Sequence, residues 1–447
     1  MIKKEVWLLL GTVGLTVILA LGMIRWLAPG LLGGATDLQL VQLDEKLPAF
    51  YDGVFRPEHF KNDQFQLKDP LTRIRNHPFL PRMVRLGPHD ILGFRNLAVP
   101  VVADVVTIGD SLTYGNNAEF EQNWPAQMAD ALGRKPAAVY NMSTGGWSAV
   151  QYLDMFSKST IFRPRVVVVA YYTGNDPLES FTMAYGVDHW HWLRPDSSLR
   201  GADSPRVVSP APESEWWPVA FSDGTRAIFT PTLRLASNQD HPAVKAGYAI
   251  MAGSAKHIAG LAGKAGIDVI FTIIPTKELV FAAKVAEEGL DVPADYATLV
   301  SRERENIATL SAHIQSLPGV HYVDVLTPLQ SAAMEGRFLY APDKDGHPFP
   351  EGYGVIGRAI ADKVNALLPD RPSGLYSLVT DDQYSFLLVN AEGVWNFNST
   401  ELIEANGWPP GEVRNITLRE LVDLPHMGAI SGVDAARFGP ACCPADN

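Results

Sequence analysis

A serine between glycines stands where a nucleophile could act. The mostly apolar, β-branched run 101–108, which only Asp104 interrupts with a charge, predicts a buried strand. It is followed by Gly-Asp-Ser-Leu-Thr-Tyr-Gly at residues 109–115. The carboxyl ends of parallel strands are where open α/β domains bind their ligands, and glycine lets a substrate approach the backbone closely. Ser111 is therefore predicted either to attack a substrate or to cap the helix that follows.

A nucleophilic serine imposes requirements on the rest of the chain. Its hydroxyl is a weak nucleophile and needs a neighbouring base. A neutral histidine can take the proton, while a carboxylate fixes the imidazole tautomer and stabilises the imidazolium. The charge that develops on a carbonyl oxygen needs preorganised donors, each worth roughly 3–4 kcal/mol.

From Ser111 onwards the sequence resembles the SGNH/GDSL hydrolase family, whose four blocks supply a serine, a glycine, an asparagine and a histidine. The first block matches residues 109–112 and implies that Ser111 is the nucleophile and that its amide is one oxyanion donor. The second is similar to residues 141–146, Asn-Met-Ser-Thr-Gly-Gly, and implies the Gly146 amide as the second donor, with Gly145 as the alternative.

The third block is similar to residues 173–176, Thr-Gly-Asn-Asp, and implies the Asn175 side chain as an oxyanion donor. The family usually has glycine where this chain has Thr173. Asp110 and Asp176 adjoin these blocks, and we interpret both as hydrogen-bonding groups that shape their turns.

The last block resembles residues 343–348, Asp-Lys-Asp-Gly-His-Pro, and implies His347 as the general base. The family usually separates the acid from the histidine by two residues, a position that Lys344 occupies here. The resemblance, which spans about residues 90–368, implies Asp345 as the triad acid, because Asp-x-His spacing also occurs among envelope O-acetylation relatives of this fold. Asp343 is the alternative.

These residues predict ester hydrolysis through an acyl-serine intermediate, with no cofactor and no metal. The expected substrates are O-acetyl esters on envelope or extracellular carbohydrate. Three alternatives stay open: an O-acyltransferase that uses the same site on polysaccharide, a lipid esterase or lysophospholipase, and an inactive polysaccharide-binding module.

Further side chains are candidates for substrate binding. Trp190, Trp192, Trp216 and Trp217 lie in one stretch without clear periodicity and could stack on sugar rings, or fill a core or lid. Lys277 follows the fourth predicted strand, where it could contact an anionic substrate, or pair with Glu278 or solvent.

Alternating strands and helices must position these groups. Further strands are predicted at 138–142, 166–172, 267–274 and 321–326, and helices at 123–132, 148–157, 242–264, 297–315 and 351–368. The pattern indicates a flavodoxin-like three-layer α/β domain with a parallel five-stranded sheet. Ser111, Gly146 and Asn175 follow the first three strands, so one edge of the sheet can gather them, and His347 precedes the last helix.

We predict four segments. Residues 1–30 form a signal anchor, 31–100 an extension packed on the main domain, 101–370 the hydrolase domain with an insertion at 177–240, and 371–447 a C-terminal extension. In the last segment, 384–389 and 394–397 flank Asn-Ala-Glu-Gly and predict a β-hairpin.

The amino terminus predicts membrane attachment. Lys3 and Lys4 precede the uncharged apolar run Val6–Ile24, which approaches the ~20 residues that span a bilayer. We expect an uncleaved signal anchor in a bacterial inner membrane with the rest of the chain in the periplasm; Gly33, Gly34 and Ala35 leave cleavage as an alternative.

Composition narrows the function classes. The formal net charge of -12 disfavours binding to nucleic acid phosphates. The only two cysteines, Cys442 and Cys443, are adjacent, which excludes a disulfide framework and offers no metal-ligand spacing. Nothing in the sequence indicates a protein partner.

Overall fold

The structure is a computed structural model of the 447-residue chain. It describes residues 66–78, 86–90, 92–97, 99–100, 103–133, 139–162, 164–205, 212–368, 377–380, 386–389, 393–408, 414–415 and 426–433. The expected anchor at residues 1–30 and the two cysteines lie outside these ranges. Within them, no helix combines the length and apolar character that crossing a membrane requires.

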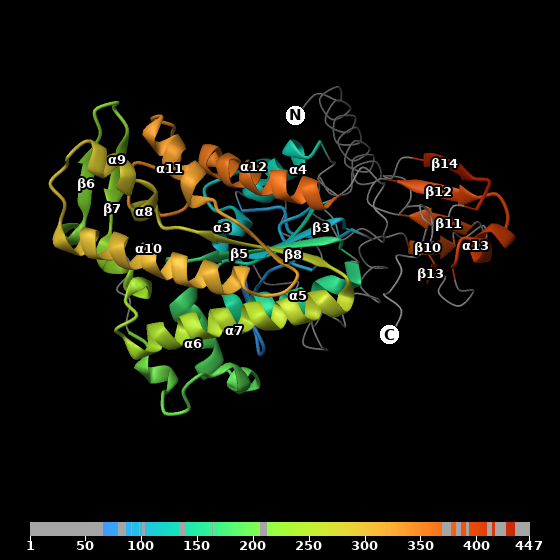
Figure 1. Ribbon diagram of the computed structural model, residues 1–447, viewed down its shortest axis with the longest axis horizontal. Coiled ribbons are helices and arrows are strands. Elements are labelled where there is room, and N and C mark those ends of the chain that lie inside the picture. The colour runs from blue at the N-terminus through green and yellow to red at the C-terminus, as the bar shows by residue number, and fades with distance from the viewer. Residues whose placement is uncertain are drawn as a thin grey trace, which may run out of the picture. The chain divides into compact units, whose positions relative to one another are not determined.

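Five parallel strands form the central sheet (Figure 1). They are β3 (Val105–Gly109), β4 (Val139–Ser143), β5 (Val166–Tyr172), β8 (Asp268–Ile274) and β9 (Val320–Val323), in the spatial order β4-β3-β5-β8-β9. This is the flavodoxin-like order, so the predicted sheet is confirmed. All seven residues of β5 are buried, as its unbroken apolar sequence requires.

Two of the predicted strands are shorter than expected. β3 begins only at Val105, directly after Asp104, the one charged residue within the predicted run. β9 ends at Val323, and the helix α11 (Leu326–Met334) starts where the prediction still had strand.

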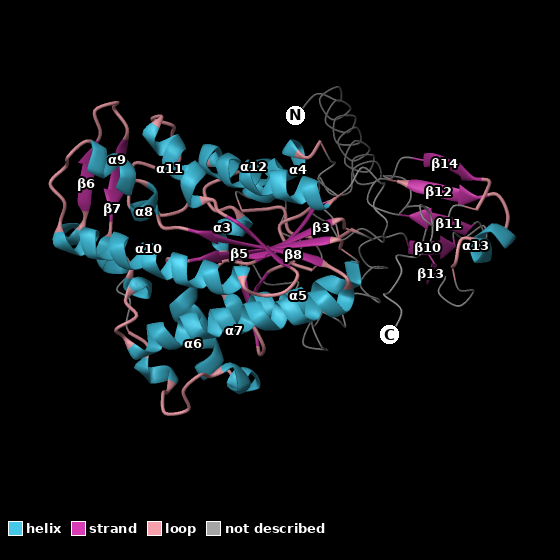
Figure 2. Ribbon diagram, viewed as in Figure 1, coloured by secondary structure: helices cyan, strands magenta, loops and turns pink. Residues whose placement is uncertain are grey.

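Helices cover both faces of the sheet (Figure 2). α4 (Trp124–Ala131) and α12 (Pro350–Leu367) pack together on one face, and α5 (Ala149–Ser159) and α7 (Pro242–Ala265) pack together on the other. α10 (Ala294–Gln315) packs against α7 and β9. Each of these helices corresponds to a predicted one.

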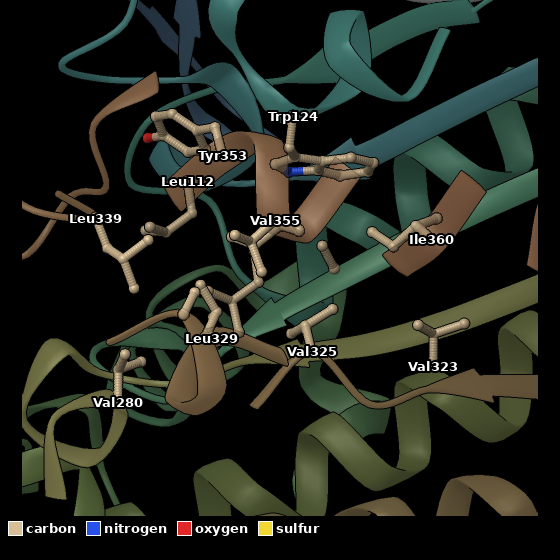
Figure 3. Packing of buried hydrophobic residues seen from close by; sticks show 14 of the residues in the cluster. Leu112, Trp124, Val280, Val323, Val325, Leu329, Leu339, Tyr353, Val355 and Ile360 are labelled. Atoms are coloured by element: carbon tan, nitrogen blue, oxygen red, sulfur yellow. The ribbon is translucent and has the colours of Figure 1, made fainter. Parts of the chain in front are cut away.

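The core between α4 and α12 follows from the apolar stripe of α12. Ile356, Ile360 and Val364 are fully buried, as their helical spacing predicts. Trp124 on α4 packs into the same cluster, and Figure 3 shows it beside Tyr353, Val355 and Ile360. This contact fixes α12, which starts three residues after His347 in the sequence, against α4, which starts 13 residues after Ser111.

The stretch 177–240 contains regular structure that its sequence did not predict. α6 (Asp176–Gly186) opens it, and β6 (Trp217–Ala220) pairs antiparallel with β7 (Arg226–Phe229). α6 escaped prediction because it is buried on most sides and shows no single apolar stripe. This region also contains the short 3₁₀ segments η6 (Asp188–Leu193), η7 (Gly201–Asp203), η8 (Glu213–Glu215), η9 (Pro231–Leu233) and η10 (Leu235–Ser237). A further one, η5 (Thr160–Phe162), follows α5.

Several short elements remain in the described part of the chain before residue 368. They are α3 (Ser111–Tyr114), η3 (Phe120–Gln122), α8 (Lys277–Val280) and α9 (Ala282–Glu287), with β1 (Gln66–Asp69) and β2 (Arg73–Asn76) as a separate two-stranded sheet. In the segment 86–97, the Asp90 carboxylate accepts hydrogen bonds from the Leu92 and Phe94 amides. This bonding forms the turn that Gly93 enters with a φ of 82°.

The C-terminal segment forms a second five-stranded sheet, in the order β13-β10-β11-β12-β14. Its strands are β10 (Ser377–Thr380), β11 (Phe386–Val389), β12 (Val394–Phe397), β13 (Arg414–Asn415) and β14 (His426–Ile430), with the helix α13 (Glu401–Ala405). β11 and β12 pair antiparallel, which confirms the two strands of the predicted hairpin. Leu388, Trp395 and Trp408 belong to an apolar cluster of this sheet's own.

A close helix contact yields a stability prediction. A Cβ added to Gly247 of α7 would lie 1.8 Å from the Pro177 carbonyl oxygen on α6, so Gly247→Ala must push the helices apart. We expect it to lower the free energy of unfolding by about 1–3 kcal/mol, measured by urea denaturation.

Gly260→Ala is the matched control in the same helix. Gly260 has nothing within 4 Å of an added Cβ, so this change should raise stability by roughly 0.5–1 kcal/mol. Equal effects of the two substitutions would contradict the packing argument.

Candidate active site

Ser111 opens the short helix α3 directly after β3. Asp110 is the helix cap: its Oδ1 accepts the Leu112 amide at 2.8 Å. The interpretation of Ser111 itself as the cap is therefore wrong, because a neighbouring carboxylate has that role. A Cβ on Gly109 would lie 2.0 Å from Thr113 Oγ1, so this tight turn requires glycine.

The Ser111 hydroxyl meets His347, which is 236 residues away in the chain. His347 Nε2 lies 2.9 Å from Ser111 Oγ, and Nδ1 lies 2.6 Å from Asp345 Oδ1. Three side chains thus form one hydrogen-bonded relay from carboxylate to imidazole to hydroxyl. With the Nδ1 proton held by the carboxylate, Nε2 is the nitrogen available to accept the serine proton.

Asp345, rather than Asp343, contacts the histidine. Asp345 Oδ1 also accepts the His347 backbone amide at 2.9 Å, and Oδ2 accepts Asn117 Nδ2 at 3.0 Å. Partial burial raises the pKa of Asp345, but the hydrogen bond and charge of His347 outweigh it and hold that pKa well below the ordinary value. The carboxyl group is therefore ionised wherever the relay operates.

Asp343 has a different contact. Its exposed carboxylate accepts the Asp345 backbone amide at 2.8 Å, so it shapes the loop that carries the relay.

The two other candidate oxyanion donors follow the strands on either side of β3. Gly146, three residues after β4, has a φ of 82° and an exposed backbone. Asn175, three residues after β5, precedes α6, and its buried Oδ1 has no hydrogen-bond partner among the described residues. Because β4, β3 and β5 are parallel neighbours, Gly146 and Asn175 leave the sheet at the same edge as Ser111.

Two buried carboxyl groups lie behind this edge. Burial raises the pKa of Asp110 to about 6, against the Leu112 hydrogen bond and the charge of His347. Burial and the charge of Asp110 raise the pKa of Asp176 well above its ordinary value. Asp176 accepts the Tyr172 amide at 2.9 Å and the Tyr152 hydroxyl at 3.2 Å, so it ties the Asn175 turn to β5 and α5.

The four tryptophans separate into two places. Trp190 is buried with its Nε1 bonded to the Leu71 carbonyl oxygen at 2.8 Å, and Trp192 packs edge-on against His257. Trp217 packs against Tyr296 in the core. Trp216 lies beside the loop 343–347, which we call the relay loop, since the Lys344 ammonium is 5.0 Å from the centre of its ring.

Lys277 lies beneath the relay loop and does not reach solvent. Its side chain is fully buried, and Nζ donates to the carbonyl oxygens of Asp343 and Asp345 at 2.6 and 2.8 Å. The expected contacts with an anionic substrate or with solvent are therefore not found, whereas the charge of Glu278, the other expected partner, does favour the protonated form of Lys277 and raises its pKa.

Sequence reasoning missed Asn117, which supports Asp345. Asn117 has a φ of 66°, and asparagine is one of the few residues that adopt this backbone conformation readily. The pair Asn116-Asn117 directly after Gly115 was the available signal. Arg234, discussed below, carried no comparable signal because it lies in the aperiodic stretch.

A serine–histidine–aspartate relay at the carboxyl edge of a flavodoxin-like sheet defines a serine hydrolase. Residues 107–355, more than half of the chain, match the model of the GDSL-like lipase/acylhydrolase family. The protein belongs to this family and is a hydrolase of ester bonds. The resemblance stated from the four sequence blocks is thereby confirmed.

Solved structures that are similar to this chain have low sequence identity to it. A lipolytic protein of the G-D-S-L family from Desulfitobacterium hafniense is 16% identical, with 58% of this chain and 98% of that chain covered at a TM-score of 0.32. A GDSL-like lipase from Bacteroides thetaiotaomicron is 15% identical, with 59% and 88% covered at 0.31. A catalytic mutant of an acetylxylan esterase from Geobacillus stearothermophilus is 11% identical, with 60% and 96% covered at 0.32. No curated protein matches the chain.

The two loop carboxylates can be separated by mutation. Asp345→Asn should lower kcat by up to about 10⁴-fold, because the amide favours the wrong imidazole tautomer. Asp343→Asn should cost far less, since an amide oxygen can still accept the Asp345 backbone amide. Steady-state hydrolysis of 4-nitrophenyl acetate measures both, and the reverse ranking would assign the acid to Asp343.

Proposed function

We propose that this protein is a serine O-acetyl esterase that acts on carbohydrate outside the cytoplasm. The observation that carries the serine mechanism is the relay in which His347 contacts Ser111 at 2.9 Å and Asp345 at 2.6 Å. The location is proposed from the apolar run Val6–Ile24 behind two lysines.

Acylation begins when Ser111 Oγ attacks the ester carbonyl carbon and its proton passes to His347 Nε2. The charge moves to the carbonyl oxygen, where the proposed donors are the amides of Ser111 and Gly146 and the side chain of Asn175. As the first residue of α3, Ser111 has a backbone N–H with no acceptor inside that helix. Collapse breaks the bond to the alkoxide, which leaves as the alcohol after His347 returns the proton.

Deacylation repeats these steps with water. His347 takes a proton from water as its oxygen attacks the acyl carbon, and the Ser111 Oγ–C bond breaks when the proton is delivered to Ser111. Asp345 stabilises the imidazolium in both halves and remains ionised, in accord with its lowered pKa. The products are an alcohol and a carboxylic acid.

The carbohydrate substrate is proposed from the rim of the site. Trp216 is half-buried, and Lys344, which neighbours its ring, stands two residues before Gly346 and three before His347. An indole face presents a broad apolar surface suited to the C–H groups of a sugar ring. A sugar that stacks on Trp216 would lie next to the loop that carries the base.

Acyl-chain preference tests the proposed function directly. The full-length protein in detergent should hydrolyse 4-nitrophenyl acetate faster than the butyrate or octanoate esters. Ser111→Ala should lower that rate by about 10⁴-fold or more without loss of folding. Preference for octanoate would favour a lipid substrate. The well-folded parent protein could instead fail to hydrolyse the esters but transfer the acetyl group to an added oligosaccharide. That result would favour an acyltransferase.

Trp216→Ala tests the sugar contact. It should raise KM for an acetylated xylo-oligosaccharide by roughly 2- to 13-fold, the equivalent of about 0.5–1.5 kcal/mol for an aromatic contact, and leave KM for ethyl acetate unchanged. Trp192→Ala is the control, because that partly exposed ring packs against His257 instead. An equal rise of KM in the two variants would argue against a specific role for Trp216.

A further inference from the structure

A fully buried cation supports the loop that carries the acid and the base. Lys277, the first residue of α8, is 0% exposed, and its ammonium donates to the carbonyl oxygens of Asp343 and Asp345. These carbonyl groups lie on either side of Lys344, so the two hydrogen bonds restrain the main chain shortly before His347. Burying an ammonium is unfavourable unless it is hydrogen-bonded or paired, which makes this placement a specific feature of the fold.

A buried carboxyl group fixes the backbone next to Lys277. Thr276 precedes it and donates both its amide, at 2.8 Å, and its hydroxyl, at 2.5 Å, to the carboxyl group of Glu303. Glu303 is fully buried on α10 and also accepts the Thr173 hydroxyl at 2.5 Å. One side chain therefore joins the start of α8 to the end of β5, two residues before Asn175.

A second cation reaches the same loop from the inserted region. Arg234 Nε donates to Glu278 Oε2 at 3.2 Å, and the Thr230 amide donates to Glu278 Oε1 at 3.0 Å. A Cβ on Gly346 would lie 2.6 Å from Arg234 Nη2, so the loop passes directly against this guanidinium. Glu278 directly follows Lys277 in the sequence. Its carboxylate neutralises part of the buried positive charge of Arg234 and Lys277.

We propose that Lys277 is a positioning residue that holds the main chain at 343–345, and so keeps Asp345 and His347 in line with Ser111. The inference rests on the proposed relay. Lys277 does not touch the substrate in this role; it acts through the carbonyl groups that it orients. A displacement of about 1 Å in such a relay can cost about 10² in rate, so its loss should appear in kcat rather than KM.

The role predicts a distinctive pH dependence. Burial lowers the pKa of Lys277 to about 8, against the charge of Glu278, while Arg234 lowers it further and Asp343 and Asp345 raise it. Above that pH the ammonium becomes an amine and its charge-assisted hydrogen bonds weaken. We therefore expect kcat of the parent protein to fall as the pH rises through about 8.

Unfolding caused by Lys277 would not produce this fall. The folded pKa of about 8 lies below the ordinary value of 10.5, so the unfolded chain binds more protons between these values. This group's contribution to folding stability therefore increases with pH across that window. Thermal melts at pH 7 and pH 9 can monitor the stability separately from the rate.

The experiment compares Lys277→Met, Lys277→Arg and Lys284→Met in the full-length protein, with kcat and KM for 4-nitrophenyl acetate measured from pH 6 to 10. Lys284 is a matched control, because it is also buried and donates to the Ala333 carbonyl oxygen at 3.0 Å, on α11 and outside the relay loop. A fluorophosphonate probe supplies a second readout: Ser111 Oγ bonds to phosphorus, fluoride leaves, and the proton passes to His347.

We expect Lys277→Met to lower kcat and the labelling rate by about 10²-fold with KM unchanged, while Lys284→Met keeps both rates. Lys277→Arg should retain activity at pH 7 and lose the fall near pH 8, since arginine does not titrate there. Parent-like rates in Lys277→Met, or an unchanged fall in Lys277→Arg, would overturn the inference. Failure of the folded parent to label at Ser111 would instead reject the proposed relay.

Discussion

The hydrogen bond between His347 Nε2 and Ser111 Oγ joins two residues that are 236 positions apart in the chain. The fold must therefore hold these two atoms 2.9 Å from each other. Ser111 is fixed by the end of β3 and the Asp110 cap. His347 lies in the loop that leads into α12. This helix packs on α4 through the cluster around Trp124 and so fixes the loop. The apolar core between these helices therefore sets the geometry of a polar reaction.

Buried ionisable groups lie on both sides of that bond. Asp110 and Asp176 lie behind the serine, and burial raises the pKa of each. On the histidine side, two cations face the loop, and Glu278 pairs with Arg234 while Lys277 is bonded to main-chain carbonyls. Removal of one partner would leave the other buried and unpaired, which costs more than the pair itself contributes.

Two departures from the family's usual pattern have physical explanations. Thr173 stands where glycine is usual, and its hydroxyl is used by Glu303. The single residue between Asp345 and His347 lets one carboxylate oxygen accept both the backbone amide and the ring nitrogen of the histidine. The acid therefore orients the main chain and the imidazole together, and Asn117 holds its second oxygen.

The sequence by itself determined the parallel sheet, the main helices and the residues of the relay, because apolar periodicity and the four short blocks are local signals. It favoured Asp345 over Asp343 only through the family resemblance, since both lie within reach of His347 along the chain, and the folded loop is what turns Asp345 to the ring. Nor did it reveal α6, whose burial on most sides removes the amphipathic pattern. The roles of Lys277, Arg234 and Glu303 were decided by tertiary structure alone, because their partners come from distant segments and burial, not spacing, gives each charge its function.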